Sequence, residues 1–454
     1  MKTPYASEKG QALIFLVLGM VVFLGFVALA IDGSMVYSDR RRAQNGADAA
    51  SLAGGGAAAL SLANDAVSDP GATYPGWNCA APAIASAQSI AVGAAIDRAN
   101  KNNFVINDDI SDHNGVTTEC GVFDNGSWVD KYIDVSTAIS TTTQTSFLEV
   151  VYNRVIQNRV NAVTRVRPTT PLAYGNAIVA LRHECPNSNT GGVHFLGGGG
   201  DDVDVHVTGG GIFSNACFVA TGNTQVVVEP VGQRNVCIGN SCYTESGGAD
   251  VTPTPITGGP QIQPAMYIVP EPNCGALPDH GNYNGGGTIS PGRYDSITLH
   301  NGDLVMEPGL YCITEGDFQA NGGSVTGSDV TIFIEADAGD FDTNGNVNIR
   351  IAAPPANNCE TPCTDFGAIP GVLIYLAEGN NGEVNLLGTS DSDYFGIVYA
   401  PTGIINAGGT GSLMGAIHTQ LIGDTVFVHG NTVIDINYDL NNQKWKPVMI
   451  DLFK

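Results

Sequence analysis

An uncharged apolar run near the N-terminus is the feature that most constrains this chain of 454 residues. It extends from Gln11 to Ile31, is rich in Leu, Val, Phe and Ile, and is followed directly by Asp32. About 20 residues of helix rise about 30 Å, which is the thickness of the hydrocarbon core of a bilayer. The run therefore predicts a transmembrane helix at residues 11–31.

The charges on either side of the run predict its orientation. Lys2, Lys9 and the amino terminus precede it, and the positive-inside rule assigns such a flank to the cytoplasm. The three arginines at 40–42 follow shortly after the run and favour the opposite orientation. The cysteines decide between the two.

All ten cysteines lie beyond the apolar run: Cys79, Cys120, Cys185, Cys217, Cys237, Cys242, Cys274, Cys312, Cys359 and Cys363. None of them has the CxxC spacing of a zinc ribbon or a thioredoxin-like site, so disulfides in an oxidising compartment are the better interpretation. We expect at least three bridges, with Cys274–Cys312 foremost because both residues flank one predicted β segment. The expected location is the cytoplasmic membrane, single-pass, with the N-terminus inside and the bulk of the chain extracytoplasmic or at the cell surface.

A cleaved signal peptide is the alternative to a retained anchor. Ala28-Leu29-Ala30 has the small-x-small pattern of a cleavage site after a hydrophobic core. The apolar run is longer than the core of a usual signal peptide, which favours retention.

A helical pattern continues beyond Asp32. Apolar and small residues recur there at roughly helical spacing, namely Met35, Val36, Ala43, Ala47, Ala50 and Leu52. Alanine, which favours helix and packs closely, is abundant as far as Ala63, whereas Gly54 to Gly56 are expected to weaken the helix. The pattern is typical of a long helix that docks against other helices.

The N-terminal 60 residues carry an ordered set of short motifs: Glu8-Lys9-Gly10-Gln11-Ala12, then the apolar helix, then Ala30-Ile31-Asp32-Gly33, Tyr37, Arg40-Arg41-Arg42 and Gln44 to Ala53. This set resembles the TadE/TadG-like N-terminal domain of the tight-adherence (Flp) pilus-assembly family. The resemblance implies an anchor domain at residues 1–63 and an envelope protein associated with pilus assembly.

Two departures from related proteins narrow that expectation. Type IV prepilins carry Glu at the fifth position after the cleavage glycine, and Phe15 stands at the corresponding place after Gly10. We therefore do not expect a processed pilin subunit. Some TadG-like proteins also carry a von Willebrand A domain with a D-x-S-x-S metal site, and this sequence lacks that motif.

The charge of the chain excludes one class of partner. The formal net charge is −25, and between Pro171 and Gln443 there is no Lys and only four Arg. So acidic a surface repels phosphate backbones, which argues against nucleic-acid binding. The simple interpretation of the acidity is solubility outside the cell, and the more specific interpretation is calcium binding.

Beyond the anchor, residue patterns divide the chain further. Residues 64–171 indicate a small α+β region, with a helix at Ala83–Asn103 and one or two strands within Phe147–Val166. From Leu172 onward, short β-rich runs alternate with Gly, Asn and Asp turns. The expected parts are 172–251, a Pro-rich linker or loop at 252–273, a main β module at 274–440 and a tail at 441–454.

The β-rich runs include Val203–Val207, Gln225–Val228, Val330–Ile334 and Val347–Ile351, separated by turns such as Asn301-Gly302. A mainly β ectodomain follows, and a right-handed β-helix or solenoid suits the recurring polar corners best. A β-sandwich is the alternative.

A second resemblance supports the solenoid. The segments from Gly292 to Phe333 and from Phe395 to Pro401, with Gly415-Ala416-Ile417 and the closing Ile436 to Asp439, are similar to β modules of envelope proteins with pilus-like anchors. Those modules resemble right-handed β-helices. Gly209 to Asn215 has the pattern of an earlier, diverged turn of the same kind.

Few residues suggest chemistry. Gly197 to Asp202 begins like a calcium-binding β-roll repeat, but Asp204 replaces the required apolar residue and there is one copy. Asp340 to Gly345 copies half of an EF-hand loop, with Ile351 in place of the bidentate Glu. A polysaccharide-cleaving site would need paired carboxylates, for which Asp391 with Asp393, or Asp201 with Asp202, are the nominees.

The sequence therefore predicts no catalytic, cofactor-binding or metal-ligating residues and no enzyme. The leading hypothesis is a structural or adhesive envelope protein associated with Tad/Flp-type pilus assembly, with the membrane, pilus-assembly or cell-envelope proteins and surface glycans as partners. A carbohydrate-active or carbohydrate-binding β-helix on the same anchor is the alternative. A third hypothesis is a minor subunit that caps or primes a pilus.

Overall fold

The computed structural model describes residues 11–65, 68–111, 113–145, 147, 155–185, 191–197, 202–230, 233–239, 241–344, 346–356, 367–389, 391–410, 413–418, 420–439 and 444–453. The chain forms two compact units, and each is described by itself. Unit 1 consists of Met1–Val122, Lys131–Thr169 and Pro447–Lys454. Unit 2 consists of Phe123–Asp130 and Thr170–Lys446.

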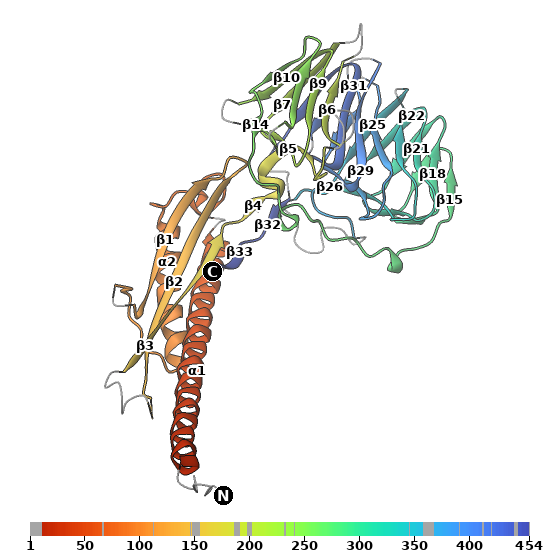
Figure 1. Cartoon of the computed structure of the whole chain (residues 1–454). Helices are drawn as coiled ribbons and strands as arrows, with labels where there is room; N and C mark the ends of the chain where they lie inside the picture. The colour runs from red at the N-terminus through yellow and green to blue at the C-terminus, as the bar shows by residue number, and fades with distance from the viewer. Residues whose placement is uncertain are drawn as a thin grey trace, which may run out of the picture. The chain divides into compact units, whose positions relative to one another are not determined.

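Unit 1 combines two helices with a four-stranded sheet in the order β1-β2-β3-β33. Its elements are α1 (Gln11–Asp65), η1 (Pro70–Ala72), α2 (Pro82–Lys101), β1 (Gly115–Asp124), β2 (Val129–Thr143), β3 (Ile156–Arg167) and β33 (Met449–Phe453). The β2–β3 and β3–β33 pairs are antiparallel. The C-terminal part of α1 lies beside the sheet, and its N-terminal part projects beyond it (Figure 1). The last strand of the chain thus belongs to the same unit as the first helix.

Several predictions for this unit are confirmed. The helix continues past Asp32 to Asp65 without a break, and α2 covers nearly all of the helix expected at Ala83–Asn103. One strand, β3, covers the predicted segment Phe147–Val166 from Ile156 onward, and residues 148–154 of that segment lie outside the described part. Gly54 to Gly56, which are expected to weaken the helix, do not interrupt it, because tertiary packing holds the backbone helical there.

Unit 2 is built almost entirely of short parallel strands. The elements up to the Pro-rich segment are β4 (Thr170–Pro171), η2 (Leu172–Gly175), β5 (Asn176–Ala180), β6 (Gly192–Leu196), β7 (Asp202–Thr208), β8 (Gly211–Ser214), β9 (Phe218–Thr221), β10 (Asn223–Glu229), β11 (Asn235–Cys237), β12 (Tyr243–Ser246), β13 (Asp250–Thr252) and β14 (Ile256–Thr257). The strands predicted at Val203–Val207 and Gln225–Val228 are β7 and β10.

The second part of unit 2 follows the short helices η3 (Pro264–Met266) and η4 (Cys274–Ala276). Its strands are β15 (Asn282–Asn284), β16 (Gly287–Ile289), β17 (Gly292–Tyr294), β18 (Ser296–Leu299), β19 (Asp303–Met306), β20 (Gly309–Ile313), β21 (Phe318–Ala320), β22 (Gly323–Gly327), β23 (Val330–Ile334), β24 (Phe341–Thr343), β25 (Val347–Ala352), β26 (Val372–Leu376), β27 (Glu383–Leu386), β28 (Asp393–Phe395), β29 (Ile397–Thr410), β30 (Leu413–His418), β31 (Leu421–Asn437) and β32 (Trp445–Lys446).

The strands of unit 2 pair in a repeating order. From β15 to β26, each strand pairs in parallel with the strand three places further along the chain, as β15 does with β18 and β18 with β21. Three strands therefore make one turn, and each turn stacks on the next, an arrangement compatible with a solenoid. The mainly β fold with an N-terminal helix is confirmed. A sandwich of antiparallel sheets does not fit this pairing.

The turns do not stack in chain order throughout. The long strand β31 pairs with β29 on one side and with β5, β6 and β7 on the other. Figure 1 shows β31 in blue beside the yellow-green β6 and β7. The first and last turns of unit 2 are therefore neighbours in the middle of the stack, and β4 pairs with β32 where the chain enters and leaves.

The two parts of unit 2 are joined by residues 258–281, which we call the return segment. Because β14 and β15 lie at opposite ends of the stack, this segment runs along the stack from one end to the other (Figure 1). It contains most of the Pro-rich stretch. The Ile262 N–H donates to Asn215 Oδ1 at 2.8 Å, and the Tyr375 hydroxyl donates to the Val269 carbonyl at 2.6 Å. The segment is thus fixed along the stack by hydrogen bonds.

The interior of the stack is filled by alternate residues of its strands. Val226 of β10, Val205 of β7 and Ile434 of β31 are in register and fully buried. Phe318 and Phe341 stack with ring centroids 4.9 Å apart on two further strands. Burying an aliphatic or aromatic side chain of this size contributes about 1.5–3 kcal/mol, so stacking the turns is what stabilises each one.

Candidate functional site

The N-terminal part of α1 is apolar and exposed on all sides. Among its described residues from Leu13 to Ile31 none is buried, and Phe15 is 73% exposed. No folded domain leaves so long an apolar surface in water. α1 is the helix in the described part of the chain that is long and apolar enough to cross a membrane. The structure therefore supports a single-pass membrane protein.

Burial of α1 begins at the residue that directly follows the apolar run. Asp32 is only 3% exposed, and its carboxylate accepts a hydrogen bond of 3.0 Å from the Phe147 N–H. One turn further, the Val36 carbonyl accepts from the Asn158 amide, and the Asp39 carboxylate accepts from the Thr143 hydroxyl at 2.8 Å. These polar contacts thus mark the level from which α1 packs against the rest of unit 1.

Small residues then pack α1 against α2 and the sheet. The buried face of α1 repeats every three or four residues and comprises Ala43, Ala47, Ala50, Gly54, Ala58 and Leu62. On α2 the matching buried residues are Ala83, Ile84, Ala87, Ala91, Ala95 and Ala99. A Cβ at Gly54 would lie 2.9 Å from the Ala91 carbonyl oxygen, so the two helices meet at backbone distance there.

Besides its backbone pairing with β3, the C-terminal strand β33 contacts an arginine of that strand. The Arg165 Nε and Nη2 atoms each donate to an Asp134 carboxylate oxygen at 2.8 Å. The guanidinium also lies 3.6 Å from the Tyr132 ring centroid and 4.5 Å from that of Phe453 on β33. An arginine paired bidentately and stacked on aromatic rings is strongly oriented, so Arg165 fixes the end of the chain to β3.

Four disulfides join described cysteines: Cys79–Cys120 in unit 1, and Cys185–Cys217, Cys237–Cys242 and Cys274–Cys312 in unit 2. The expectation of at least three bridges, including Cys274–Cys312, is confirmed. Cys359 and Cys363 lie outside the described residues.

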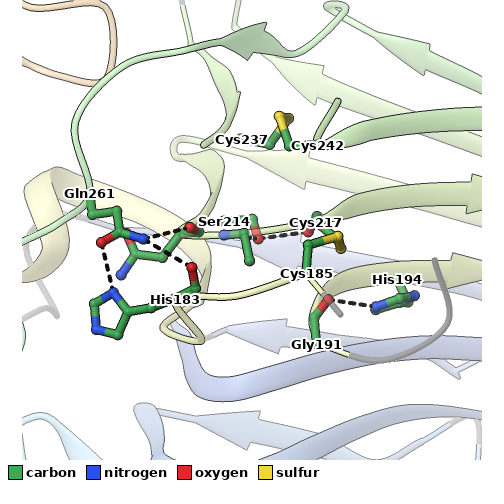
Figure 2. The surroundings of a disulfide bond; sticks show 11 residues. His183, Cys185, Gly191, His194, Ser214, Cys217, Cys237, Cys242 and Gln261 are labelled. Atoms are coloured by element: carbon green, nitrogen blue, oxygen red, sulfur yellow. Dashed lines mark hydrogen bonds between the residues drawn. A yellow bond between two sulfur atoms is a disulfide. The ribbon is translucent and has the colours of Figure 1, made fainter. Parts of the chain in front are cut away.

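Two of these bridges occupy the same corner of the stack (Figure 2). Cys217 directly precedes β9, and Cys242 directly precedes β12, which stacks on β9. The Ser214 hydroxyl donates to the Cys217 carbonyl at 2.7 Å, and the Gln261 side chain bonds to His183 nearby. The Cys185–Cys217 bridge therefore ties two successive turns at a corner that the return segment also contacts.

The residues considered for calcium are used in structural contacts. The Asp340 carboxylate accepts from the Glu383 N–H at 2.7 Å, and that of Asp342 accepts from the Asn385 amide. Gly345 lies outside the described residues, as do residues 198–201 of the β-roll-like segment, and Asp202 begins β7. Among the described residues, no three His, Cys, Asp or Glu side chains are grouped so as to hold a metal ion.

Asp391 and Asp393, one of the two pairs nominated for catalysis, lie on the outer side of the stack. Asp393 of β28 is in register with Arg350 of β25, and the Arg350 Nε donates to the Asp391 carbonyl at 3.3 Å. Asp201 lies outside the described residues. The absence of enzyme activity stays a prediction.

Two carboxylates of unit 2 have shifted pKa values for opposite reasons. Hydrogen bonds from the Arg234 guanidinium, at 2.6 and 2.8 Å, and from the Gly126 N–H lower the pKa of Asp124 to about 2. Burial raises the pKa of Asp424, although Arg182 lies 3.4 Å away. The Asp124–Arg234 pair joins the segment 123–130 to the residue that directly precedes β11.

One cluster was not recognised as a site from the sequence. Arg41 and Arg42 of α1 line a cleft of about 490 Å³ together with Arg98 and Lys101 at the end of α2. In the sequence, the arginines at 40–42 indicate only membrane orientation and the family resemblance. The second pair lies more than 50 residues further along the sequence, so only the α1–α2 packing brings the four cations together.

Comparison with known families agrees with the architecture of the N-terminus. One apolar exposed helix, continued as the packing helix of an α+β unit, is consistent with a single-span membrane protein. Residues 10–60 match the family model for Flp pilus-assembly TadE/G-like proteins. The match spans almost the whole of α1 and confirms the resemblance of the anchor domain. No curated protein and no solved structure matches the chain.

Proposed function

We propose that this protein is a membrane-anchored structural or adhesive component of a Tad/Flp-type pilus-assembly system, with unit 2 displayed on the extracytoplasmic side. The match at residues 10–60, on a helix whose apolar part is exposed all round, carries this proposal. Four disulfides support an oxidising compartment for the rest of the chain. The proposal includes no catalytic step.

The architecture of unit 2 supports a display role. Stacked turns are stabilised by their neighbours and need no single central site, so such a unit offers long lateral faces to a partner. Its few cations are consistent with a soluble surface facing water. In this role unit 2 contacts a surface, a glycan or a pilus protein through its outer side chains.

Membrane retention is tested on the full chain. Cells that produce it are fractionated, and the N-terminus of the membrane-bound protein is sequenced. We expect the protein in membranes with residues 11–31 retained. A mature N-terminus at Ile31, with the protein in the soluble fraction, would instead establish a cleaved signal peptide and remove the anchor from the proposal.

The role of unit 2 is tested by excision. Thr170 pairs with Lys446, so the two ends of unit 2 are adjacent and a short Gly/Ser linker can replace the residues between them. We expect this variant to remain in membranes, to lose surface attachment or pilus assembly, and to leave polysaccharide turnover unchanged. A variant with an unrelated soluble domain of similar size in the same place is the control. It distinguishes the effect of losing unit 2 itself from the effect of losing any folded domain of that size. Normal attachment by both variants would overturn the proposal.

One observation favours a second function, binding of a glycan. Thr298, Gln319, Asp342, Asn385 and Asn406 occupy successive register positions on the outer side of neighbouring strands. Parallel strands lie about 4.8 Å apart, so these half-exposed side chains form a regular polar ladder. Amides and carboxylates are good partners for sugar hydroxyls.

Side chains of the same ladder also hydrogen-bond to one another, and the experiment must distinguish this structural role from glycan binding. The Asn406 amide donates to Asn385 Oδ1 at 2.8 Å, so part of its hydrogen-bonding capacity is already taken. Polysaccharide binding by the purified full chain is measured for Asn385→Leu and for Thr326→Leu, which lies on another outer face in β22. Loss of binding with Asn385→Leu alone, in a folded protein, supports a glycan surface. Release of reducing ends by the wild-type chain would contradict the non-enzymatic proposal.

A further inference from the structure

The cleft between α1 and the end of α2 is electropositive in an otherwise acidic protein. Four of its lining residues are the cations Arg41, Arg42, Arg98 and Lys101, and none of the residues that line it is acidic. The whole chain has only 19 Lys and Arg against 44 Asp and Glu. We call this cluster of four cations the basic cleft.

Most of the charge in the basic cleft is available to a ligand. Lys101 forms an exposed ion pair of 2.7 Å with Asp97, and such pairs contribute little. The Arg42 guanidinium lies 5.6 Å from the Phe104 ring centroid, which orients it without neutralising it. Polar donors complete the lining, since the amides of Asn45, Asn102 and Asn103 belong to the cleft.

The basic cleft lies close to the membrane boundary. Arg41 follows Ile31 by ten residues, which is about 15 Å along a helix, and a headgroup layer occupies about 5–7 Å of that distance. Side chains on a helix point toward its N-terminus, so those of Arg41 and Arg42 are directed back toward the bilayer. Tyr37, 68% exposed, lies between the two levels, where interfacial aromatic residues are common.

The second helix delivers its cations to the same level. A Cβ on Gly46 would lie 2.4 Å from the Phe104 ring, which places the residues just after α2 against this part of α1. Arg98 and Lys101 are in the last turn of α2, where cations are also favoured by the helix dipole. The α1–α2 packing therefore presents four cations at one end of unit 1, the end nearest the apolar helix.

We propose that the basic cleft binds the phosphate group of an anionic phospholipid in the leaflet from which α1 emerges. Guanidinium groups match phosphate oxygens in paired hydrogen bonds, and basic clusters next to a membrane span attract anionic headgroups. Bound lipid fixes the height and rotation of unit 1 at the bilayer. This inference rests on retention of α1 in the membrane and not on a role in pilus assembly, and incorporation into nanodiscs tests retention separately.

The experiment uses the full chain in nanodiscs made of phosphatidylcholine alone or of an equimolar mixture with phosphatidylglycerol. Lipids that stay bound after release from the disc are identified by native mass spectrometry. We expect retention of phosphatidylglycerol over phosphatidylcholine. Each basic residue near a membrane changes the affinity about five-fold, so Arg41→Gln and Arg98→Gln should each lower the retention ratio by about that factor. The double variant should lower it further.

Matched variants make the result specific. Arg98→Lys keeps the charge and should retain most of the preference, whereas Arg293→Gln removes an equal charge from unit 2 and should change nothing. Formation of the Cys79–Cys120 disulfide reports that unit 1 is folded in each variant. Unchanged lipid retention in the double variant, or an equal loss with Arg293→Gln, would overturn the proposal. Displacement of the lipid by inorganic phosphate at comparable concentration would show a site for free anions instead of a headgroup.

Discussion

Three consecutive glycines in α1 allow the packing of unit 1 to be tested against helix propensity. Gly54 and Gly55 are buried, whereas Gly56 is partly exposed and has no atom within 4 Å of the position of an added Cβ. At Gly54 the same Cβ would lie 2.9 Å from both the Ala91 carbonyl oxygen and Val135 Cγ1. Gly54→Ala and Gly56→Ala thus make the same chemical change in two different surroundings.

The two substitutions should have different effects on the stability of unit 1. Alanine in place of glycine favours a helix by about 1 kcal/mol at either position. At Gly54 the new methyl group meets backbone that cannot move cheaply, and overpacking of this kind costs about 1–3 kcal/mol. We expect Gly56→Ala to stabilise unit 1 by about 1 kcal/mol. Gly54→Ala should leave it unchanged or destabilise it by up to about 2 kcal/mol.

Hydrogen exchange measures this difference locally in the full chain. The protein is kept in detergent micelles, and exchange of the α2 amides is followed by mass spectrometry, since local opening there reports the α1–α2 contact. Exchange should be slower in Gly56→Ala and unchanged or faster in Gly54→Ala, by about tenfold for each 1.4 kcal/mol. Equal slowing in both variants would refute close backbone packing at Gly54.

Three further outcomes are expected for the full chain. Removal of the Cys274–Cys312 bridge by paired Ser substitutions should lower the stability of unit 2 by roughly 3–4 kcal/mol, since the bridge closes a loop of 38 residues. Denaturant titration measures this loss, and an unchanged unfolding midpoint would contradict it. The Asp124–Arg234 pair should stabilise unit 2 fully above the ordinary carboxyl pKa near 3.8, and this stabilisation should be lost as the pH falls toward about 2. Because Asp124 is half exposed, Asp124→Asn should lower the stability by less than about 1 kcal/mol at neutral pH and should have no effect at the acid end. Unfolding curves measured over a series of pH values check both expectations. A chain ending at Lys446 lacks β33 and should show rapid exchange along β3, and protection equal to that of the full chain would exclude a role for the last strand.

Local pattern was sufficient to predict the helices and several strands of unit 2, but not β1 or β2 of unit 1. The apolar run and the spacing of small residues predict α1, because burial on one face of a helix repeats every three or four residues. Gly, Asn and Asp at corners predict short stacked strands, because these residues tolerate the backbone conformations of tight turns. The continuity of α1 through Gly54 to Gly56 was not predictable, since it depends on partners that lie 35 or more residues away.

Contacts between distant segments were beyond the sequence patterns. Nothing in Leu421–Asn437 indicates that β31 pairs with β5 to β7, because parallel pairing has no local signal comparable to a hairpin turn. The basic cleft was missed for a similar reason. The run Arg40–Arg42 stands out in the sequence, but Arg98 and Lys101 look like the ordinary C-terminal cations of a surface helix until α2 packs on α1.

The order of the turns in unit 2 follows from where the chain enters and leaves it. In unit 1, Arg167 at the end of β3 is in register with Met449 at the start of β33, so these two positions are neighbours. A solenoid wound in chain order from one end to the other would separate its own ends by the length of the stack. The return segment at 258–281 and the long strand β31 bring the first and last turns together instead, and Thr170 pairs with Lys446. Because β33 follows unit 2 in the sequence, the sheet that packs on α1 reaches its four-stranded form only after the whole of unit 2 has been made. Units 1 and 2 are therefore coupled in assembly through β33.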